Sequence, residues 1–338
     1  MSRNLLLSLT ASSALLGGAA WADVPKVAAD IAPVHSLVSR VMQGVGEPAL
    51  IVPPGATPHE YSLRPSEAAA LQASDLVFWI GPDLTPWMND AIQTLAANAS
   101  VTALMEVDGT TELPFREGVL FEAHTHADDD AHDHDEDHGH SDDHGHEEAH
   151  EHDHDEKAHD DHGHDHGHGA HDPHAWLSPD NGAVWLNEIA AQLSAADPDN
   201  AGTYYANAAA AREELNTLTT EINAILDPVR GRNFIVFHDA YQYFETAFEL
   251  PASGAISISD ATDPSPARIA AIQERVKEQD VTCVLSEPQF DPKIVAAVLD
   301  GSEARTGVLD PLGSDLEPGS DLYGAVLRNL AVALADCL

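Results

Sequence analysis

A dense run of histidines and acids divides this chain and limits what it can fold into. Of the 21 histidines, 17 lie between His124 and His171, interleaved with Asp, Glu and Gly. Such a tract has almost no apolar side chains to offset the entropy lost on ordering, and its carboxylates repel one another. It is therefore expected to be a solvated loop in the absence of metal, and a packed core must come from the residues on either side.

The composition of the tract is typical of metal capture. Imidazole nitrogen is a common ligand of zinc, copper and nickel, and the neighbouring carboxylates add oxygen donors. A solubilising insert is the alternative, although acids alone would serve that purpose and a purification tag would lie at a terminus. The segment 122–172 is predicted to be an auxiliary metal loop with the ligands His124, His126, His132, His134, His138, His140, His144, His146, His150, His152, His154, His159, His162, His164, His166, His168 and His171.

The N-terminus has the features of a secretory signal. Arg3 precedes an apolar run, and Ala20, Trp21 and Ala22 form a small-x-small cleavage site, so residues 1–22 are expected to be removed. The apolar run is too short for a spanning helix, and no cysteine follows it to carry a lipid. We therefore expect an exported protein of a bacterial periplasm that is not lipid-anchored.

The net charge of −42 argues against two classes of partner. It repels nucleic acid and anionic lipid, and no basic cluster offers a phosphate-binding surface. Cations are the natural ligands of such a chain. Without the signal and the tract, roughly 265 residues remain to fold, which suits two moderate domains better than one.

Strand-like and helix-like runs alternate on both sides of the tract, which predicts parallel strands with helical crossovers. The expected strands are 26–29, 49–52, 75–80 and 101–105 before the tract and 234–237, 255–259, 282–286 and 306–309 after it. The expected helices are 33–43, 65–73, 178–195 and 198–226.

The last of these helices would reach roughly 40 Å at ~1.5 Å per residue, which is enough to run along two lobes. The predicted fold class is therefore α/β, with two similar lobes that are each a parallel-type sheet flanked by helices, joined by one long helix. The lobes are expected at 23–178, which includes the tract, and at 231–338, with the linking helices at 179–230. The cleft between such lobes is the default place for a ligand.

The chain has two cysteines, and we expect them to form one disulfide. Cys283 lies in an apolar strand-like run and Cys337 stands one residue from the end. Thiols in an oxidising compartment should pair, and this bond would close a loop of about 54 residues, contributing on the order of 4 kcal/mol in the chain-entropy model. Two free buried thiols are the alternative, and a zinc-thiolate site is disfavoured because no CxxC spacing occurs.

Three histidines outside the tract stand where predicted strands end or loops begin, namely His59, His174 and His238. Open α/β sheets hold ligands at such positions. Each has an acid beside it or two residues away, and a metal-bound imidazole usually donates its second ring N–H to a carboxylate. The candidate acceptors are Glu60, Asp172 and Asp239. The spacing alone leaves two interpretations open, a metal ligand or a hydrogen-bonded structural histidine.

Six short segments spread over essentially the whole mature chain form a characteristic series, and they are 53–66, 79–82, 172–179, 237–241, 286–290 and 309–313. In sequence and in order they resemble the ZnuA-type family, the zinc-binding periplasmic proteins of ABC importers within the cluster A-I, or cluster 9, metal solute-binding group. The acidic His-rich insert also falls at the family's place, just before the second candidate ligand. The resemblance implies two lobes joined by a rigid long helix, with one Zn²⁺ held in the cleft.

Carried over residue by residue, the resemblance implies three imidazole ligands, His59, His174 and His238. The fourth ligand stays open: Asp310 matches an acid of related metal binders, and Glu60 or water are the other options. Some zinc-specific members have an acid directly before the first histidine, where this chain has Pro58. Three imidazoles with at most one carboxylate suit tetrahedral zinc, whereas manganese needs more oxygen donors and copper can compete.

The implied function is that of a periplasmic solute-binding protein that captures Zn²⁺ with high affinity and delivers it to an inner-membrane ABC permease. The chain is expected to be a monomer and not an enzyme, with periplasmic zinc chaperones as a further class of partner to consider. One alternative is a zinc hydrolase with Glu60 or Glu287 as base, but the GxSxG motif is missing from the sequence, and HExxH matches occur only inside the low-complexity tract, at 146–150 and 150–154, where no helix is expected to present them. The other is a zinc buffer without a permease, which would not need two lobes.

Overall fold

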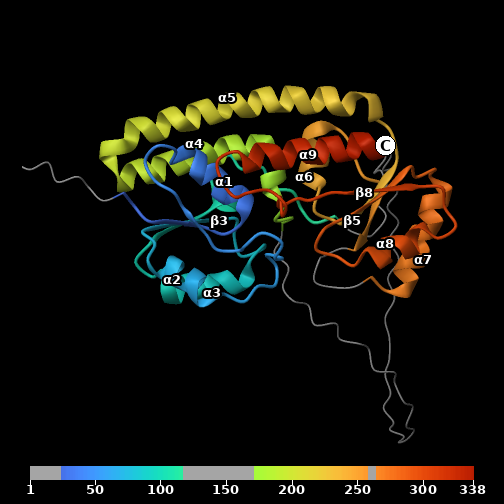
Figure 1. The fold of residues 1–338 in the computed structure, drawn as a ribbon, viewed down its shortest axis with the longest axis horizontal. Helices are drawn as coiled ribbons and strands as arrows, with labels where there is room; N and C mark the ends of the chain where they lie inside the picture. The colour runs from blue at the N-terminus through green and yellow to red at the C-terminus, as the bar shows by residue number, and fades with distance from the viewer. Residues whose placement is uncertain (1–23, 117–170, 258–263) are drawn as a thin grey trace, which may run out of the picture.

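The computed structural model describes residues 24–116, 171–257 and 264–338, which form two α/β lobes spanned by one long helix (Figure 1). The predicted signal and the tract histidines from His124 to His168 lie outside the described residues. The N-terminal lobe contains β1 (Val27–Ala29), α1 (Ala32–Val41), β2 (Ala49–Leu50), α2 (Pro65–Gln72), β3 (Leu76–Trp79), α3 (Pro86–Leu95), β4 (Ser100–Ala103) and a 3-10 turn (Leu104–Glu106).

The second half of the chain begins with the linking helices and continues into the C-terminal lobe. The linking segment contains a 3-10 turn (Ala175–Leu177), α4 (Pro179–Ala196), a 3-10 turn (Pro198–Asn200), α5 (Ala201–Leu226) and a 3-10 turn (Asp227–Val229). The C-terminal lobe contains β5 (Phe234–His238), α6 (Gln242–Phe248), β6 (Gly254–Ser257), α7 (Pro266–Glu278), β7 (Cys283–Ser286), α8 (Pro292–Leu299), β8 (Arg305–Val308) and α9 (Leu322–Cys337).

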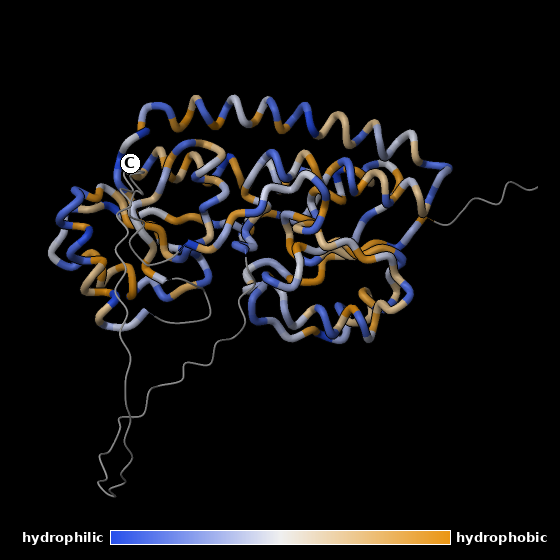
Figure 2. The backbone as a smooth tube through the Cα atoms, turned by 180° about the vertical axis from the view of Figure 1, so that it is seen from behind, coloured by the Kyte–Doolittle hydropathy of each residue, from blue (hydrophilic) through white to orange (hydrophobic). Residues whose placement is uncertain are grey.

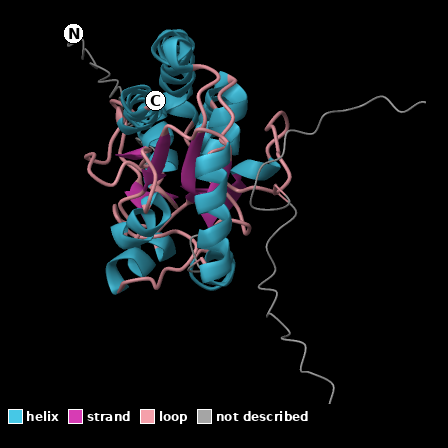
Figure 3. Cartoon of the chain, turned by 90° about the vertical axis from the view of Figure 1, so that its right-hand side faces the viewer, coloured by secondary structure: helices cyan, strands magenta, loops and turns pink. Residues whose placement is uncertain are grey.

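Each lobe is built on a four-stranded parallel sheet, and the two sheets have the same topology. The strand orders are β2-β1-β3-β4 and β6-β5-β7-β8, and every neighbouring pair is parallel. Strands β1, β3 and β5 are buried along their whole length, because helices lie on both sides of the strands (Figure 3). In a parallel sheet all strands end at one edge, so the loops that follow the strands gather there.

Helix α5 is held against both lobes mainly by apolar packing. Its buried residues recur every three or four positions, the spacing of one helix face, and are Tyr204, Ala208, Ala211, Leu215, Leu218, Ile222 and Leu226. Figure 2 shows the matching alternation of hydrophobic and hydrophilic residues along this helix. Glu214 and Glu221 of α5 also pair at 2.7 Å with Arg40 of α1 and Arg328 of α9, but such exposed pairs contribute little.

Most elements lie where the sequence predicts them, with a few differences at element ends. The side chain of Ser178 accepts a hydrogen bond from the backbone N–H of Asn181 at 3.3 Å, which confirms the predicted cap of α4. The helix expected over 198–226 starts as a 3-10 turn before α5 begins at Ala201. The sequence did not predict α3, whose apolar pattern is weak because only Met88 and Ile92 are buried.

A disulfide joins Cys283 to Cys337, as the cysteine count predicts. Their Cα atoms are 5.8 Å apart across a sequence separation of 54. The bond ties the start of β7 to the end of α9, so the C-terminal helix is fixed to the sheet of its own lobe. Among the described helices, none is both long enough and apolar enough to cross a bilayer.

Candidate metal centre

The three predicted histidines meet around one small cavity between the lobes. His59 lies in the loop after β2, His174 directly before the turn that leads into α4, and His238 is the last residue of β5. The ring centroids are 5.5 Å apart for His59 and His174 and 5.2 Å apart for His174 and His238. All three line a cavity of about 20 Å³, together with Thr57, Pro58, Trp176, Glu287, Gln289, Phe290, Pro311 and Leu312. That volume suits a single ion or water molecule.

The rings of His174 and His238 point their Nε2 atoms at each other. These two nitrogens are 3.4 Å apart. Two nitrogen ligands on a tetrahedral zinc, each ~2.0–2.1 Å from the metal, are themselves about 3.4 Å apart. Within the described residues no three His, Cys, Asp or Glu side chains form a complete metal-binding cluster. The structure therefore shows a preformed pair of nitrogens, with the ring of His59 next to it.

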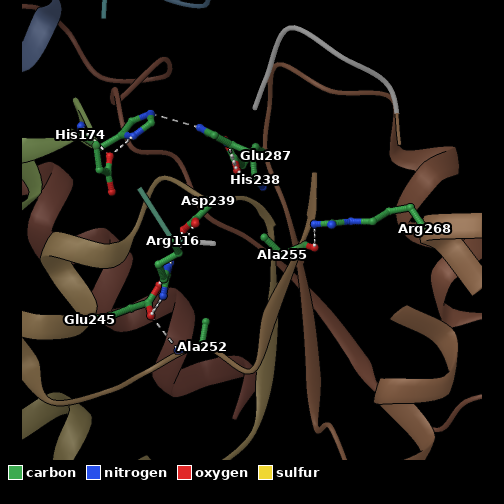
Figure 4. A network of polar contacts seen from close by, with 10 residues as sticks. Arg116, His174, His238, Asp239, Glu245, Ala252, Ala255, Arg268 and Glu287 are labelled. Atoms are coloured by element: carbon green, nitrogen blue, oxygen red, sulfur yellow. Dashed lines mark hydrogen bonds and ion pairs between the residues drawn. The ribbon is translucent and has the colours of Figure 1, made fainter. Parts of the chain in front are cut away.

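A buried carboxylate holds the other ring nitrogen of each member of this pair. The Nδ1 of His174 is 2.7 Å from Oδ1 of Asp172, and the Nδ1 of His238 is 2.7 Å from Oε1 of Glu287. The same carboxylates accept the backbone N–H groups of His174 and His238, at 3.0 Å and 3.3 Å. Figure 4 shows the two rings facing each other, with Glu287 beside His238.

These contacts fix the tautomer of both rings. A carboxylate only accepts hydrogen bonds, so each Nδ1 carries a proton, and in the neutral form of each ring the lone pair lies on Nε2. Two lone pairs that face each other at 3.4 Å repel unless a cation lies between them. The geometry of His174 and His238 is therefore suited to binding a cation.

The electrostatics of the site are dominated by buried acids. Burial raises the pKa of Asp172 to about 7, and the backbone N–H of His174 and the charge of Arg116 oppose this rise. Asp172 is 1% exposed and Glu287 is 4% exposed. A divalent cation held by neutral imidazoles would be balanced by these two carboxylates.

The sequence-based choice of acceptor was right for His174 and wrong for His238. Successive side chains of a strand point to opposite faces, so Asp239 turns away from the cavity that His238 faces. Glu287 takes its place because it directly follows β7, which pairs with β5 and ends at the same edge. An acid immediately after a predicted neighbouring strand was the signal in the sequence that could have identified it.

Asp239 instead belongs to a buried ion cluster with Arg116 and Glu245. The Nε of Arg116 donates to Oδ1 of Asp239 at 2.9 Å, and its Nη1 donates to Oε2 of Glu245 at 2.7 Å (Figure 4). Burial raises the pKa of both acids, and the guanidinium of Arg116 opposes that rise. The cluster attaches the chain just before residue 117 to the C-terminal lobe.

The chain that leads into the tract and the chain at its C-terminal end lie side by side, next to the segment that carries His174. Pro114 and His171 form an antiparallel bridge, and the hydroxyl of Tyr243 donates to the carbonyl of Asp172 at 2.9 Å while accepting from the backbone N–H of Leu113 at 2.8 Å. His171, the described histidine of the tract, is 3.5 Å from a carboxylate oxygen of Glu112. The described residues that precede the tract and those at its C-terminal end are thus held beside the two carboxylate-held histidines.

The two carboxylates considered for a fourth ligand lie outside the cavity wall. Asp310 accepts hydrogen bonds from the backbone N–H groups of Leu312, Gly313 and Ser314, at 3.1, 2.9 and 2.5 Å. Pro311 and Leu312 line the cavity, but Asp310 does not. Glu60 is exposed and likewise does not line it.

A small histidine-walled cavity between two parallel α/β lobes, spanned by one long helix, defines the class of two-lobed metal-type solute-binding proteins. Residues 27–337 match the family described as ZnuA, zinc-uptake complex component A, periplasmic. The chain belongs to this family. It is 49% identical over 337 residues to the high-affinity zinc uptake system protein ZnuA of Brucella abortus, with 98% of each chain covered.

Two further comparisons agree with this assignment. The high-affinity zinc uptake system protein ZnuA of Paracoccus denitrificans is 46% identical over 330 residues, with 96% of each chain covered. A crystal structure of ZnuA superposes with a TM-score of 0.69 at 24% identity, covering 93% of this chain and 99% of that one. The last likeness concerns the fold alone, and it agrees with the two parallel sheets and the long linking helix.

Proposed function

We propose that this protein captures one Zn²⁺ between its lobes through His59, His174 and His238 and delivers it to an ABC-type permease of the inner membrane. The observation that carries the proposal is the pair of facing Nε2 atoms 3.4 Å apart, each on a ring whose Nδ1 is held by a buried carboxylate. Family membership and the zinc-uptake names of the relatives support zinc as the cargo.

The donor set favours zinc over competing metals. Three imidazoles give a nitrogen-rich, four-coordinate site, whereas manganese prefers more oxygen donors and higher coordination. Copper(II) binds such nitrogen sites more tightly than zinc in general, so selection against it depends on geometry and on which metal is available. The family to which the chain belongs is described as a component of a zinc-uptake complex, which favours a carrier over a zinc hydrolase.

The tract acts in this proposal as a collector that raises the local zinc concentration beside the cavity. The nearest described residues on either side of 117–170, Arg116 and His171, lie near the two carboxylate-held histidines, so weakly bound zinc would need to travel only a short way. Removal of residues 122–170 should leave one tight zinc per protein and abolish the weaker ones. Such a deletion must keep Asp172, because its carboxylate orients His174.

The metal titration of single variants tests the ligand set. Zinc is titrated into the signal-free protein and into its His59→Ala, His174→Ala and His238→Ala variants, with stoichiometry and thermal stabilisation as readouts. Each variant should lose the tight binding step. His171→Ala is the control, because this histidine is 42% exposed and belongs to the tract. If any one of the three variants keeps the tight step, that residue is not a ligand.

The pH dependence of zinc uptake tests the tract separately. Metal must displace protons from imidazole, so the number of weakly bound zinc ions should fall between about pH 7 and about pH 5. A stoichiometry that does not change over this range would contradict the role of the tract as a collector.

A further inference from the structure

Gln289 lines the cavity and carries a buried amide oxygen. The residue follows β7 by three positions and lines the cavity together with the three histidines. Its Oε1 is shielded from solvent, and no donor among the described residues reaches it. Buried acceptors nearly always have a donor, so an oxygen of this kind points to a hydrogen-bonded group that belongs in the cavity.

The orientation of this amide is fixed by its other end. Its Nε2 donates to Oγ of Ser314 at 3.0 Å, and the hydroxyl of Ser314 donates to Oδ1 of Asp310 at 3.3 Å. Because a carboxylate can only accept hydrogen bonds, the hydroxyl of Ser314 donates its proton to Asp310 and accepts the N–H of Gln289. The NH₂ group of Gln289 is thus committed to Ser314, and Oε1 lies at the opposite end of the amide.

The same chain of contacts removes Asp310 from competition for the metal. Its Oδ1 accepts from the backbone N–H groups of Leu312 and Gly313, and its Oδ2 accepts from that of Ser314. A carboxylate with this many donors would lose them on turning towards the cavity. Glu60 is exposed and does not line the cavity, which leaves water as the fourth ligand.

We propose that Gln289 is a positioning residue whose Oε1 accepts a hydrogen bond from a water molecule that completes the zinc coordination shell. This inference rests on the proposed zinc-carrier function. A neutral water keeps the site balanced, because the two charges of zinc are already matched by Asp172 and Glu287. A water ligand also exchanges more readily than a carboxylate, which suits a protein that must release its cargo.

The test compares Gln289→Met with Gln273→Met, the same change on α7, where the amide donates to the carbonyl of Ala297 at 2.8 Å. Zinc affinity is measured by competition with a chelator, and the visible spectrum of the Co²⁺-loaded protein is recorded with and without azide, which can replace water. Gln289→Met should bind zinc about tenfold more weakly, as is typical when a group behind the ligands is lost. Gln273→Met should behave as the wild type.

Three outcomes decide the proposal. In the wild type, a Co²⁺ spectrum that changes with azide supports a water ligand. Wild-type zinc affinity in Gln289→Met, with an unchanged melting temperature of the metal-free form, would overturn the role of Gln289. If azide leaves the Co²⁺ spectrum of the wild type unchanged but alters that of Asp310→Asn, Asp310 is the fourth ligand. This result would also overturn the proposal. Failure of the carrier function is separate, since it would appear as tight zinc binding in the histidine variants.

Discussion

The two lobes share one sheet topology, and each uses a buried carboxylate to join the ends of its two central strands. In the N-terminal lobe, Asp30 follows β1 and its Oδ2 accepts the backbone N–H of Ile80, which follows β3, at 2.7 Å. In the C-terminal lobe, Glu287 follows β7 and its Oε1 accepts the backbone N–H of His238, at the end of β5, at 3.3 Å. By position in the sheet, β1 corresponds to β5 and β3 to β7. The carboxylate therefore follows the first strand of the central pair in the N-terminal lobe and the second strand in the C-terminal lobe.

This difference explains why the lobes present their histidines in different ways. Oδ1 of Asp30 also accepts the backbone N–H of Ile31 at 2.8 Å, so this carboxylate is occupied by the main chain. Glu287 also accepts the ring N–H of His238, so the imidazole at the end of β5 is held in a fixed orientation. The N-terminal lobe offers His59 from a loop beyond β2 instead, where the indole N–H of Trp87 donates to the carbonyl of Pro58 at 2.8 Å.

The largest expected effect concerns the disulfide, which only the C-terminal lobe has. Replacing both Cys283 and Cys337 by Ser should lower the free energy of unfolding of that lobe by about 2–4 kcal/mol. Denaturant unfolding of the metal-free protein is followed by circular dichroism for both lobes and by tryptophan fluorescence. The described tryptophans all precede β5, so fluorescence reports the N-terminal lobe and linking helices. Equal shifts of both signals would show that the lobes unfold as one unit.

The buried Asp30 should make the stability of the metal-free protein depend on pH. Burial raises the pKa of this carboxyl to about 7, so the folded state keeps a proton that the unfolded state releases at lower pH. The free energy of unfolding should therefore fall as pH rises, by about 2–3 kcal/mol between about pH 4.5 and about pH 6.5.

Urea unfolding across this range, with a chelator present, measures the slope. Asp30→Asn should reduce the slope without abolishing it, because the buried Asp172 acts in the same direction. An identical slope in the variant would show that Asp30 is ionised throughout.

The zinc affinity should respond to Glu287 and not to Asp30, although both carboxylates bridge central strands. Glu287→Gln removes the charge that holds His238 and should weaken zinc binding by about 10–100-fold. Asp30→Asn is the matched control and should change the dissociation constant by less than about threefold, because the carboxylate of Asp30 accepts hydrogen bonds from the backbone of Ile31 and Ile80. Chelator competition measures both, and equal losses in the two variants would contradict the distinction between the lobes.

The smallest expected effect is on the loop that carries His59. Trp87→Phe keeps an aromatic ring but removes one hydrogen bond to the carbonyl of Pro58, worth about 0.5–1.5 kcal/mol. Zinc should dissociate a few-fold faster, which stopped-flow release into a chelator would measure. Trp185→Phe removes a comparable indole contact, 3.0 Å from Oγ1 of Thr110 and away from the cavity, and should leave the release rate unchanged. Faster release in both variants would indicate a general loosening of the lobe.

The chain's local patterns were enough to predict most of the fold, and together with the family resemblance they singled out the histidines that gather at the cavity. Alternating apolar runs mark the strands and α5, and Ser178 before Pro179 marks the start of α4. The disulfide could be predicted because the chain has two cysteines and an oxidising compartment was expected. His59, His174 and His238 were found because each stands where a predicted strand ends or a loop begins, and parallel strands end at a common edge.

The tertiary structure alone decided which acid serves which histidine. Asp172 could be named from the sequence because it is two residues from His174 and within reach of its ring. Glu287 is 49 residues from His238, and Asp239, its neighbour in sequence, faces Arg116 on the other side of the strand. Local spacing fixes which residues form a strand and where it ends. The register between strands, which brings distant side chains within 3 Å of each other, is set by packing of the whole sheet.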